Sequence, residues 1–92
     1  MNIPQITSID NALRIYYHYA EIGNKEIADL FGKRSSATIL RLKKMAKTQM
    51  SEKGVLSYGA NKVNTEVAFE VWGIDIKDLE KRKKKIRELD LG

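Results

Sequence analysis

The segment NKEIADLFGKRSSATILRLKKMAKTQM, from Asn24 to Met50, decides the fold. Apolar residues recur at helical spacing in its first third and again in its second half. One helix is expected to begin after the N-cap residue Asn24 and to end at Gly32. A second helix is expected to begin after Ser35 or Ser36, to run to about Met50 or Glu52, and to be stopped by Gly54. The segment therefore predicts two consecutive helices joined by a tight turn.

Positive charge is concentrated in the same segment. From Leu30 to Ser51 the chain has six Lys or Arg residues and no Asp or Glu. The whole chain has 17 basic and 12 acidic residues, so the rest of it has 11 basic and 12 acidic residues. The net charge of +5 is therefore local, and a local basic surface of this kind favours contact with a nucleic-acid backbone.

The flanking sequence predicts a mostly α, single small domain. A first helix, capped by Thr7 or Ser8, is expected to reach Gly23, where a positive φ would end it. Residues 55–64, VLSYGANKVN, fit an ordered loop better than a short hairpin or wing, because their alternation of polar and apolar residues is poor. Two further helices are expected over residues 65–92. The resulting organisation is a three-helix core (1–54), a loop or minimal wing (55–64) and C-terminal helices (65–92).

Composition excludes several classes of function. The chain has no cysteine and a single histidine, His18, so it lacks the residues for a disulfide, a thiolate metal site or a zinc site. No run of about 18 apolar residues predicts a membrane span, and the N-terminus does not look like a signal peptide. We therefore expect a cytoplasmic protein that is not an enzyme, with no metal, no cofactor and no small-molecule effector domain.

Two residues give the predicted turn a recognisable pattern. Ala28 is small where the second helix must cross the first, and Gly32 follows it by four residues. Over residues 24–46 this pattern resembles the helix-turn-helix DNA-binding families, particularly the small regulators of bacteria and phages. Lys33, rather than an apolar residue, follows the glycine, so the turn is expected to be one residue longer than in the tightest form. The resemblance implies sequence-specific binding of double-stranded DNA and transcriptional regulation.

The helix over residues 36–50 has two faces when it is projected at about 100° per residue. Its inward face is expected to hold Ile39, Leu42, Ala46 and Met50. On the opposite face lie the residues expected to contact DNA bases, which are Ala37, Leu40, Arg41, Lys44 and Thr48. Residues at the edges of that face, and in the turn before it, are expected to hold phosphates, and these are Lys33, Arg34, Ser35, Ser36, Lys43 and Lys47.

The last helix is basic and narrowly amphipathic. Its run Lys81–Lys85 fits a solvated face first and an accessory nucleic-acid contact second, because two pairs of opposite charge, Asp78 with Arg82 and Glu80 with Lys84, are spaced four residues apart. Its apolar stripe could pack on its own chain or on the same helix of a second copy. Trp72, just before it, could be either core or an interface anchor. The expected interface of a homodimer consists of Trp72, Ile76, Leu79, Ile86 and Leu89.

Two other functional readings remain open from the sequence. One is an assembly adaptor, since the small packaging subunits of phages resemble this order of a helix-turn-helix domain and an oligomerising helix. The other is a protein-interaction module with the helix-turn-helix shape and no nucleic-acid partner.

Overall fold

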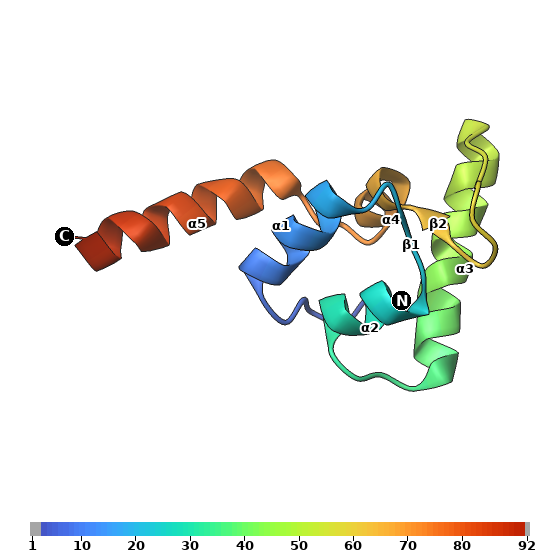
Figure 1. The fold of residues 1–92 in the computed structure, drawn as a ribbon, viewed down its shortest axis with the longest axis horizontal. Coiled ribbons are helices and arrows are strands. Elements are labelled where there is room, and N and C mark those ends of the chain that lie inside the picture. Colours follow the sequence, from blue (N-terminus) through green and yellow to red (C-terminus); the bar gives the residue numbers. More distant parts are fainter. Residues whose placement is uncertain (1–2, 92) are drawn as a thin grey trace.

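The computed structural model describes residues 3–91 and confirms a mostly α fold. Figure 1 shows a helical body from which the C-terminal helix extends away. The helices are α1 (Ile9–His18), α2 (Asn24–Phe31), α3 (Ser36–Lys53), α4 (Thr65–Val71) and α5 (Ile76–Leu91). The strands are β1 (Glu21–Ile22) and β2 (Val63–Asn64). No helix within residues 3–91 is both long and apolar enough to cross a membrane.

The first helix is shorter than the sequence predicted. It is capped by Ser8, whose hydroxyl accepts a hydrogen bond from the Asn11 amide, and it ends at His18 instead of reaching Gly23. Gly23 has a φ of −117°, so the expected positive φ is wrong. Gly23 is instead the N-cap of α2, and its amide donates to the Glu26 carboxylate over 2.8 Å. Asn24, the expected cap, is the first residue of that helix.

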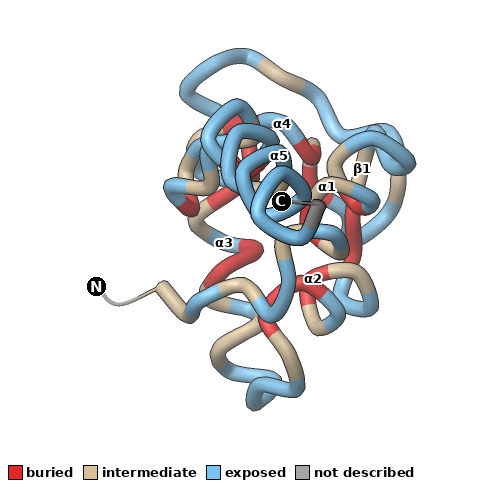
Figure 2. Tube along the Cα trace, turned by 90° about the vertical axis from the view of Figure 1, so that its left-hand side faces the viewer, coloured by how far each residue is buried: buried red, intermediate tan, exposed pale blue. Residues whose placement is uncertain are grey.

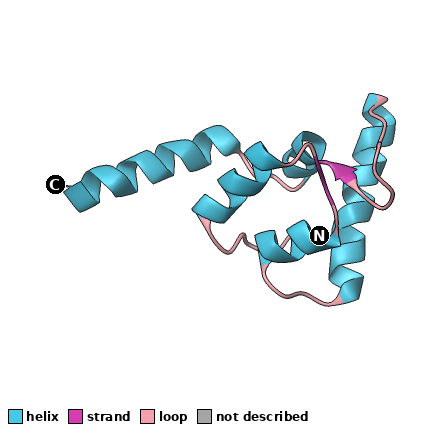
Figure 3. Cartoon of the chain, viewed as in Figure 1, coloured by secondary structure: helices cyan, strands magenta, loops and turns pink. Residues whose placement is uncertain are grey.

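A two-stranded antiparallel sheet takes the place of the end of the predicted first helix. Ile22 pairs with Val63 and Glu21 with Asn64, and the Thr65 amide donates to the Ala20 carbonyl over 3.0 Å. Figure 3 shows these short strands between the helices. Ile22 and Val63 are fully buried. Most of the segment 55–64 is a loop, as the sequence favoured. Its last two residues form β2, which pairs with the distant strand β1, and the segment does not form a hairpin with itself.

The core lies where α2, α3 and α4 meet. Leu42, on the inner face of α3, is fully buried, and its carbonyl oxygen accepts a hydrogen bond from the indole of Trp72 over 3.0 Å. The Trp72 ring stands edge-on to Phe31 of α2, with 5.3 Å between ring centroids. One aromatic side chain thus joins three helices, and Figure 2 places the buried residues in this part of the chain.

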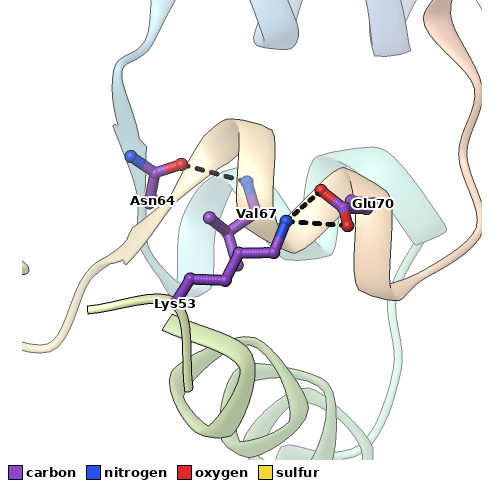
Figure 4. Close-up of polar contacts among 4 residues, drawn as sticks. All are labelled: Lys53, Asn64, Val67 and Glu70. Carbon is purple, nitrogen blue, oxygen red and sulfur yellow. Dashed lines mark hydrogen bonds and ion pairs between the residues drawn. The ribbon is translucent and has the colours of Figure 1, made fainter. Parts of the chain in front are cut away.

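Polar contacts fix the far end of α3 against α4. Gly54 ends α3 in a left-handed conformation with a φ of 71°. Figure 4 shows the Lys53 ammonium between both carboxylate oxygens of Glu70, at 2.6 and 2.8 Å. The Asn64 side chain caps α4 by accepting from the Val67 amide over 3.0 Å. The orientation of α3 in the body is therefore set from both its apolar face and its C-terminal end.

The last helix packs most closely against the body over its first turns, and further along Ile86, Arg87 and Asp90 share an open groove with Ser8, Ile9 and Asp10. Asp75 caps it by accepting from the Lys77 amide over 3.0 Å, and Leu79 is buried at 8% exposure. Lys83 forms an ion pair with Asp10 of α1 over 2.7 Å. Beyond that contact α5 projects from the body (Figure 1) and is largely exposed (Figure 2).

Candidate nucleic-acid interface

Four residues, Gly32 to Ser35, join α2 to α3. A glycine and an arginine side chain lie at the end of α2, and a serine side chain caps the start of α3. Gly32 has a φ of 81°, a conformation in which other residues are strained. The Arg34 Nε donates to the Phe31 carbonyl over 3.1 Å, which places a cation at the C-terminal end of α2. Ser35 caps α3 by accepting from the Thr38 amide over 3.2 Å. The turn therefore holds the start of α3 in one position relative to α2.

The two faces of α3 are those that the sequence predicted, with one exception. Leu42, Ala46 and Met50 are buried, and Ile39 is partly buried. The outer face of α3, by which we mean Ala37, Leu40, Arg41, Lys44, Lys47 and Thr48, is exposed except for Arg41, which is partly buried. Because the inner face is fixed in the core, the outer face is presented on a rigid support.

Three of the expected base-contacting residues line one surface groove. Arg41, Lys44 and Thr48 lie along α3, and Val71 of α4 forms part of the opposite wall. Ala37 and Leu40 lie on α3 outside this groove, and Leu40 is 67% exposed. Arg41 and Lys44 bring two basic side chains to this groove, whose lining also includes the acidic Glu52.

Lys43 is the exception, and its expected exposure at the edge of the outer face is wrong. Its side chain is buried, with 6% exposure. The physical reason is its position on the helix, four residues after Ile39 and three before Ala46, which is on the inward side. Burial lowers the pKa of the Lys43 ammonium, and the nearby Lys47 lowers it further. The other expected phosphate-binding side chains are exposed, namely Lys33, Arg34, Ser35, Ser36 and Lys47.

A loop next to this region is held by a residue that the sequence analysis did not single out. The Glu21 carboxylate accepts hydrogen bonds from the amides of Tyr58 and Gly59, over 2.9 and 2.8 Å. These hydrogen bonds, the one from Tyr58 contributing most, lower the pKa of Glu21 below its ordinary value. Ser57 adds hydrogen bonds to the carbonyls of Gly59 and Lys62. No local signal indicated this role, because Glu21 was expected to lie in a helix.

The residues of the expected dimer interface lie in two different environments, some buried within the chain and others exposed. Trp72 and Leu79 are buried in their own chain, with 4% and 8% exposure, and so do not form an interface. Ile76 is partly buried against the core, while Ile86 and Leu89 are 52% and 79% exposed on the projecting half of α5. Trp72 has the first of its two expected roles, because its indole reaches a carbonyl of α3.

The acidic residues of α5 find partners only partly as expected. Asp78 pairs with Arg82 over 2.9 Å, four residues later, as the spacing predicted. Glu80, which was expected to face Lys84, accepts a hydrogen bond from the Tyr17 hydroxyl of α1 instead. That hydrogen bond is the main cause of a raised pKa for Tyr17. The α5 run of basic residues is thus partly neutralised where the helix lies next to the body.

Within the part of the chain that the structure describes, no three His, Cys, Asp or Glu side chains lie close enough together to hold a metal ion. His18 makes a hydrogen bond between its Nδ1 and the Arg14 carbonyl, over 2.8 Å. Comparison with known proteins finds no matching family model, no matching curated protein and no matching solved structure.

Proposed function

We propose that this protein binds double-stranded DNA through α3, whose outer face enters the major groove. The observation that carries the proposal is the groove that Arg41, Lys44 and Thr48 share on a helix fixed by its opposite face. The major groove is wide enough to admit one α-helix, and Arg and Lys are the usual partners of guanine O6 and N7. Such a helix needs a rigid support, which the buried inner face of α3 supplies.

Phosphate contacts would come from both sides of that groove. Lys33, Arg34 and the two serines Ser35 and Ser36 lie in the turn and at the start of α3, where free backbone amides and the helix dipole favour an anion. Lys47 lies one turn further along the outer face. This arrangement supports a positioning role for the turn and a reading role for the middle of α3.

The regulatory part of the proposal rests on the small size of one recognition helix. A single helix reads only a few base pairs, so a regulator commonly binds two half-sites about 34 Å apart as a two-fold dimer. Ile86 and Leu89 are exposed on the projecting half of α5, where a second copy could reach them. We propose a homodimeric transcriptional regulator that acts in the cytoplasm of a bacterial cell, either for the cell itself or for a phage.

The projecting α5 also supports a second candidate, an assembly adaptor that oligomerises strongly and binds DNA weakly. Its distal half contacts no other part of the described chain closely enough to bury Ile86 or Leu89. A sedimentation measurement distinguishes the two candidates: a dimer with sequence preference fits the regulator, and a higher oligomer without sequence preference fits the adaptor.

The proposal is tested by fluorescence anisotropy with a labelled duplex of random sequence, at about 50 and 200 mM salt. About six phosphate contacts predict a loss of affinity of roughly 10³-fold between these two conditions. Absence of binding even at the lower salt concentration would overturn the proposal and would favour a protein partner instead.

A further inference from the structure

A second groove lies on the other side of α3, between its first turns, the start of α2 and the loop 55–62. Its volume is about 580 Å³. The polar residues that line it are Asn24, Lys25, Ser36, Lys43 and Asn61, and Ala28 and Ile39 contribute apolar surface. We call it the Lys43 groove. None of its lining residues is acidic.

Lys43 is unusual because it is buried without a counter-charge. Its side chain is 6% exposed, and among the described residues it has neither an ion pair nor a hydrogen-bond partner. The Lys43 ammonium is not among the fully buried polar atoms that lack a partner, so the buried part of the side chain is mainly its aliphatic stem, and the ammonium faces the groove that the residue lines. Lys47 lies close enough to lower the pKa of Lys43, which adds positive charge and no compensation.

The other lining residues provide donors that converge on the same space. Lys25 and Asn24 occupy the first turn of α2, where the positive end of the helix dipole lies. Asn61, from the loop, lines the opposite wall. Contact between the loop and α2 is close, since a Cβ on Gly23 would stand 3.9 Å from the Asn61 carbonyl oxygen.

From this arrangement we propose that the Lys43 groove binds a phosphate group, with Lys43 as its buried anchor and Lys25, Asn24 and Asn61 as further donors. A phosphate has several acceptor oxygens in a tetrahedral arrangement, which suits donors that approach from α2, α3 and the loop. The proposal stands on the groove and does not require the proposed function. The phosphate could belong to a nucleic-acid backbone or to a small phosphorylated molecule.

The Lys43 groove and the outer face lie on neighbouring sides of α3. Ser36, Leu40 and Lys43 form one stripe along the helix, roughly 100° around the axis from the stripe of Arg41, Lys44 and Thr48. A duplex that places its major groove over the outer face would therefore bring a backbone phosphate toward the Lys43 groove. A free phosphorylated molecule would compete with that phosphate.

The test uses two-dimensional NMR of the full chain, with inorganic phosphate titrated in the millimolar range at constant ionic strength. We expect shifts confined to the amides of Asn24, Lys25, Ser36 and Asn61. In Lys43→Met, which keeps the length of the side chain, the affinity for phosphate should fall by about tenfold or more. The matched control is Lys84→Met, which removes one exposed positive charge from α5 and should leave phosphate affinity unchanged.

Stability provides a second readout that does not depend on a ligand. Because Lys43→Met keeps the buried stem and removes an ammonium that has no ion pair and lies near Lys47, the midpoint of thermal unfolding in phosphate-free buffer should not fall, and Lys84→Met should leave it unchanged too. A Lys43→Met protein that is less stable than the wild type would overturn the proposal that Lys43 waits for an anion. Equal phosphate affinity in the wild type and Lys43→Met would overturn it too.

A parallel titration with an unlabelled duplex identifies the source of the phosphate. Shifts at the groove with both duplex and inorganic phosphate support the proposal with the backbone as source. Shifts with inorganic phosphate in a protein that binds no duplex support it with a small phosphorylated molecule, although the proposed function would then be wrong. Duplex binding that leaves the groove unshifted, together with no shift in inorganic phosphate, would overturn the groove proposal and leave the proposed function standing.

Discussion

Helices α3 and α5 are both rich in lysine and arginine, but the protein holds them in different ways. One face of α3 is buried in the core, with Leu42 and Ala46 fully buried, and the chain has no acidic residue from Leu30 to Ser51. Among the described side chains of α5, from Ile76 to Asp90, Leu79 alone is buried, and Lys83 is paired with Asp10 of α1. Basic composition alone therefore does not distinguish a binding helix from a solvated one. The structural difference between these two helices is how far the core fixes them, since several side chains of α3 are fully buried and most of those of α5 are exposed.

The largest difference expected between the two helices is in stability. Leu42→Ala removes a fully buried side chain from α3, and the free energy of unfolding should fall by about 2–5 kcal/mol. The same change in α5, Leu89→Ala, affects a side chain that is 79% exposed and should cost about 0.5 kcal/mol or less. Chemical denaturation measures both, and equal losses would contradict the contrast between the two helices.

The next largest difference is expected in DNA binding. Replacing both Arg41 and Lys44 by glutamine should weaken duplex binding roughly 100-fold, because one base-reading and one further cationic contact are lost. The matched variant in α5 replaces Lys81 and Lys85 by glutamine and removes the same net charge. It should weaken binding only about threefold, by a long-range electrostatic effect. Anisotropy at one salt concentration compares them, and a loss of equal size in both would mean that α3 has no special role.

Removal of residues 84–92 tests what the projecting half of α5 does. The deletion leaves Leu79 and the Lys83–Asp10 ion pair in place, so stability should change by less than about 1 kcal/mol. Under the proposed dimer, the shortened protein should be a monomer in sedimentation equilibrium, because Ile86 and Leu89 are gone. A shortened protein that remains dimeric would show that the interface lies elsewhere.

The smallest expected effect concerns the contact between Glu21 and the loop 55–62. In Glu21→Gln the amides of Tyr58 and Gly59 lose a charged acceptor, so both should exchange faster with deuterium. The folded-state pKa of Glu21 lies below its ordinary value of 4.5, so its stabilisation is present above that pH and is lost as the pH falls through the folded-state pKa. Wild type and variant should therefore exchange alike in strong acid, and a difference that persists there would contradict the assignment.

The parts of the fold that local sequence determines could be predicted. Ser35 and Gly54 bound α3 as cap and terminator, and the spacing of Leu42, Ala46 and Met50 identified its inner face. The mostly α fold followed from the same kind of pattern in the other helices. These features depend on residues within a few positions of one another, which is the range that a periodic pattern covers.

The wrong predictions were caused by contacts between residues that lie far apart in the sequence or by tertiary packing. Residues 19–22 leave the helix because Glu21 and Ile22 pair with Val63 and Asn64, and no local pattern announces a partner so distant in the chain. Lys43 was placed at the edge of the outer face because lysine is rarely buried, although its helical position pointed inward. The contact of Trp72 with the Leu42 carbonyl depends on how α4 packs, which is a tertiary feature.

The short pairing of β1 with β2 also has a consequence for folding. It closes the chain from residue 21 to residue 64 into a single loop that contains both α2 and α3. The entropy cost of closing a loop grows only slowly with its length, by about 0.6 kcal/mol for each doubling, so residues could be inserted into the segment 55–57 at little cost. Because Ile22 and Val63 meet only after the whole loop has formed, their pairing is expected late in folding. The last step of folding would then be the one that joins the segment between α1 and α2 to the segment between α3 and α4.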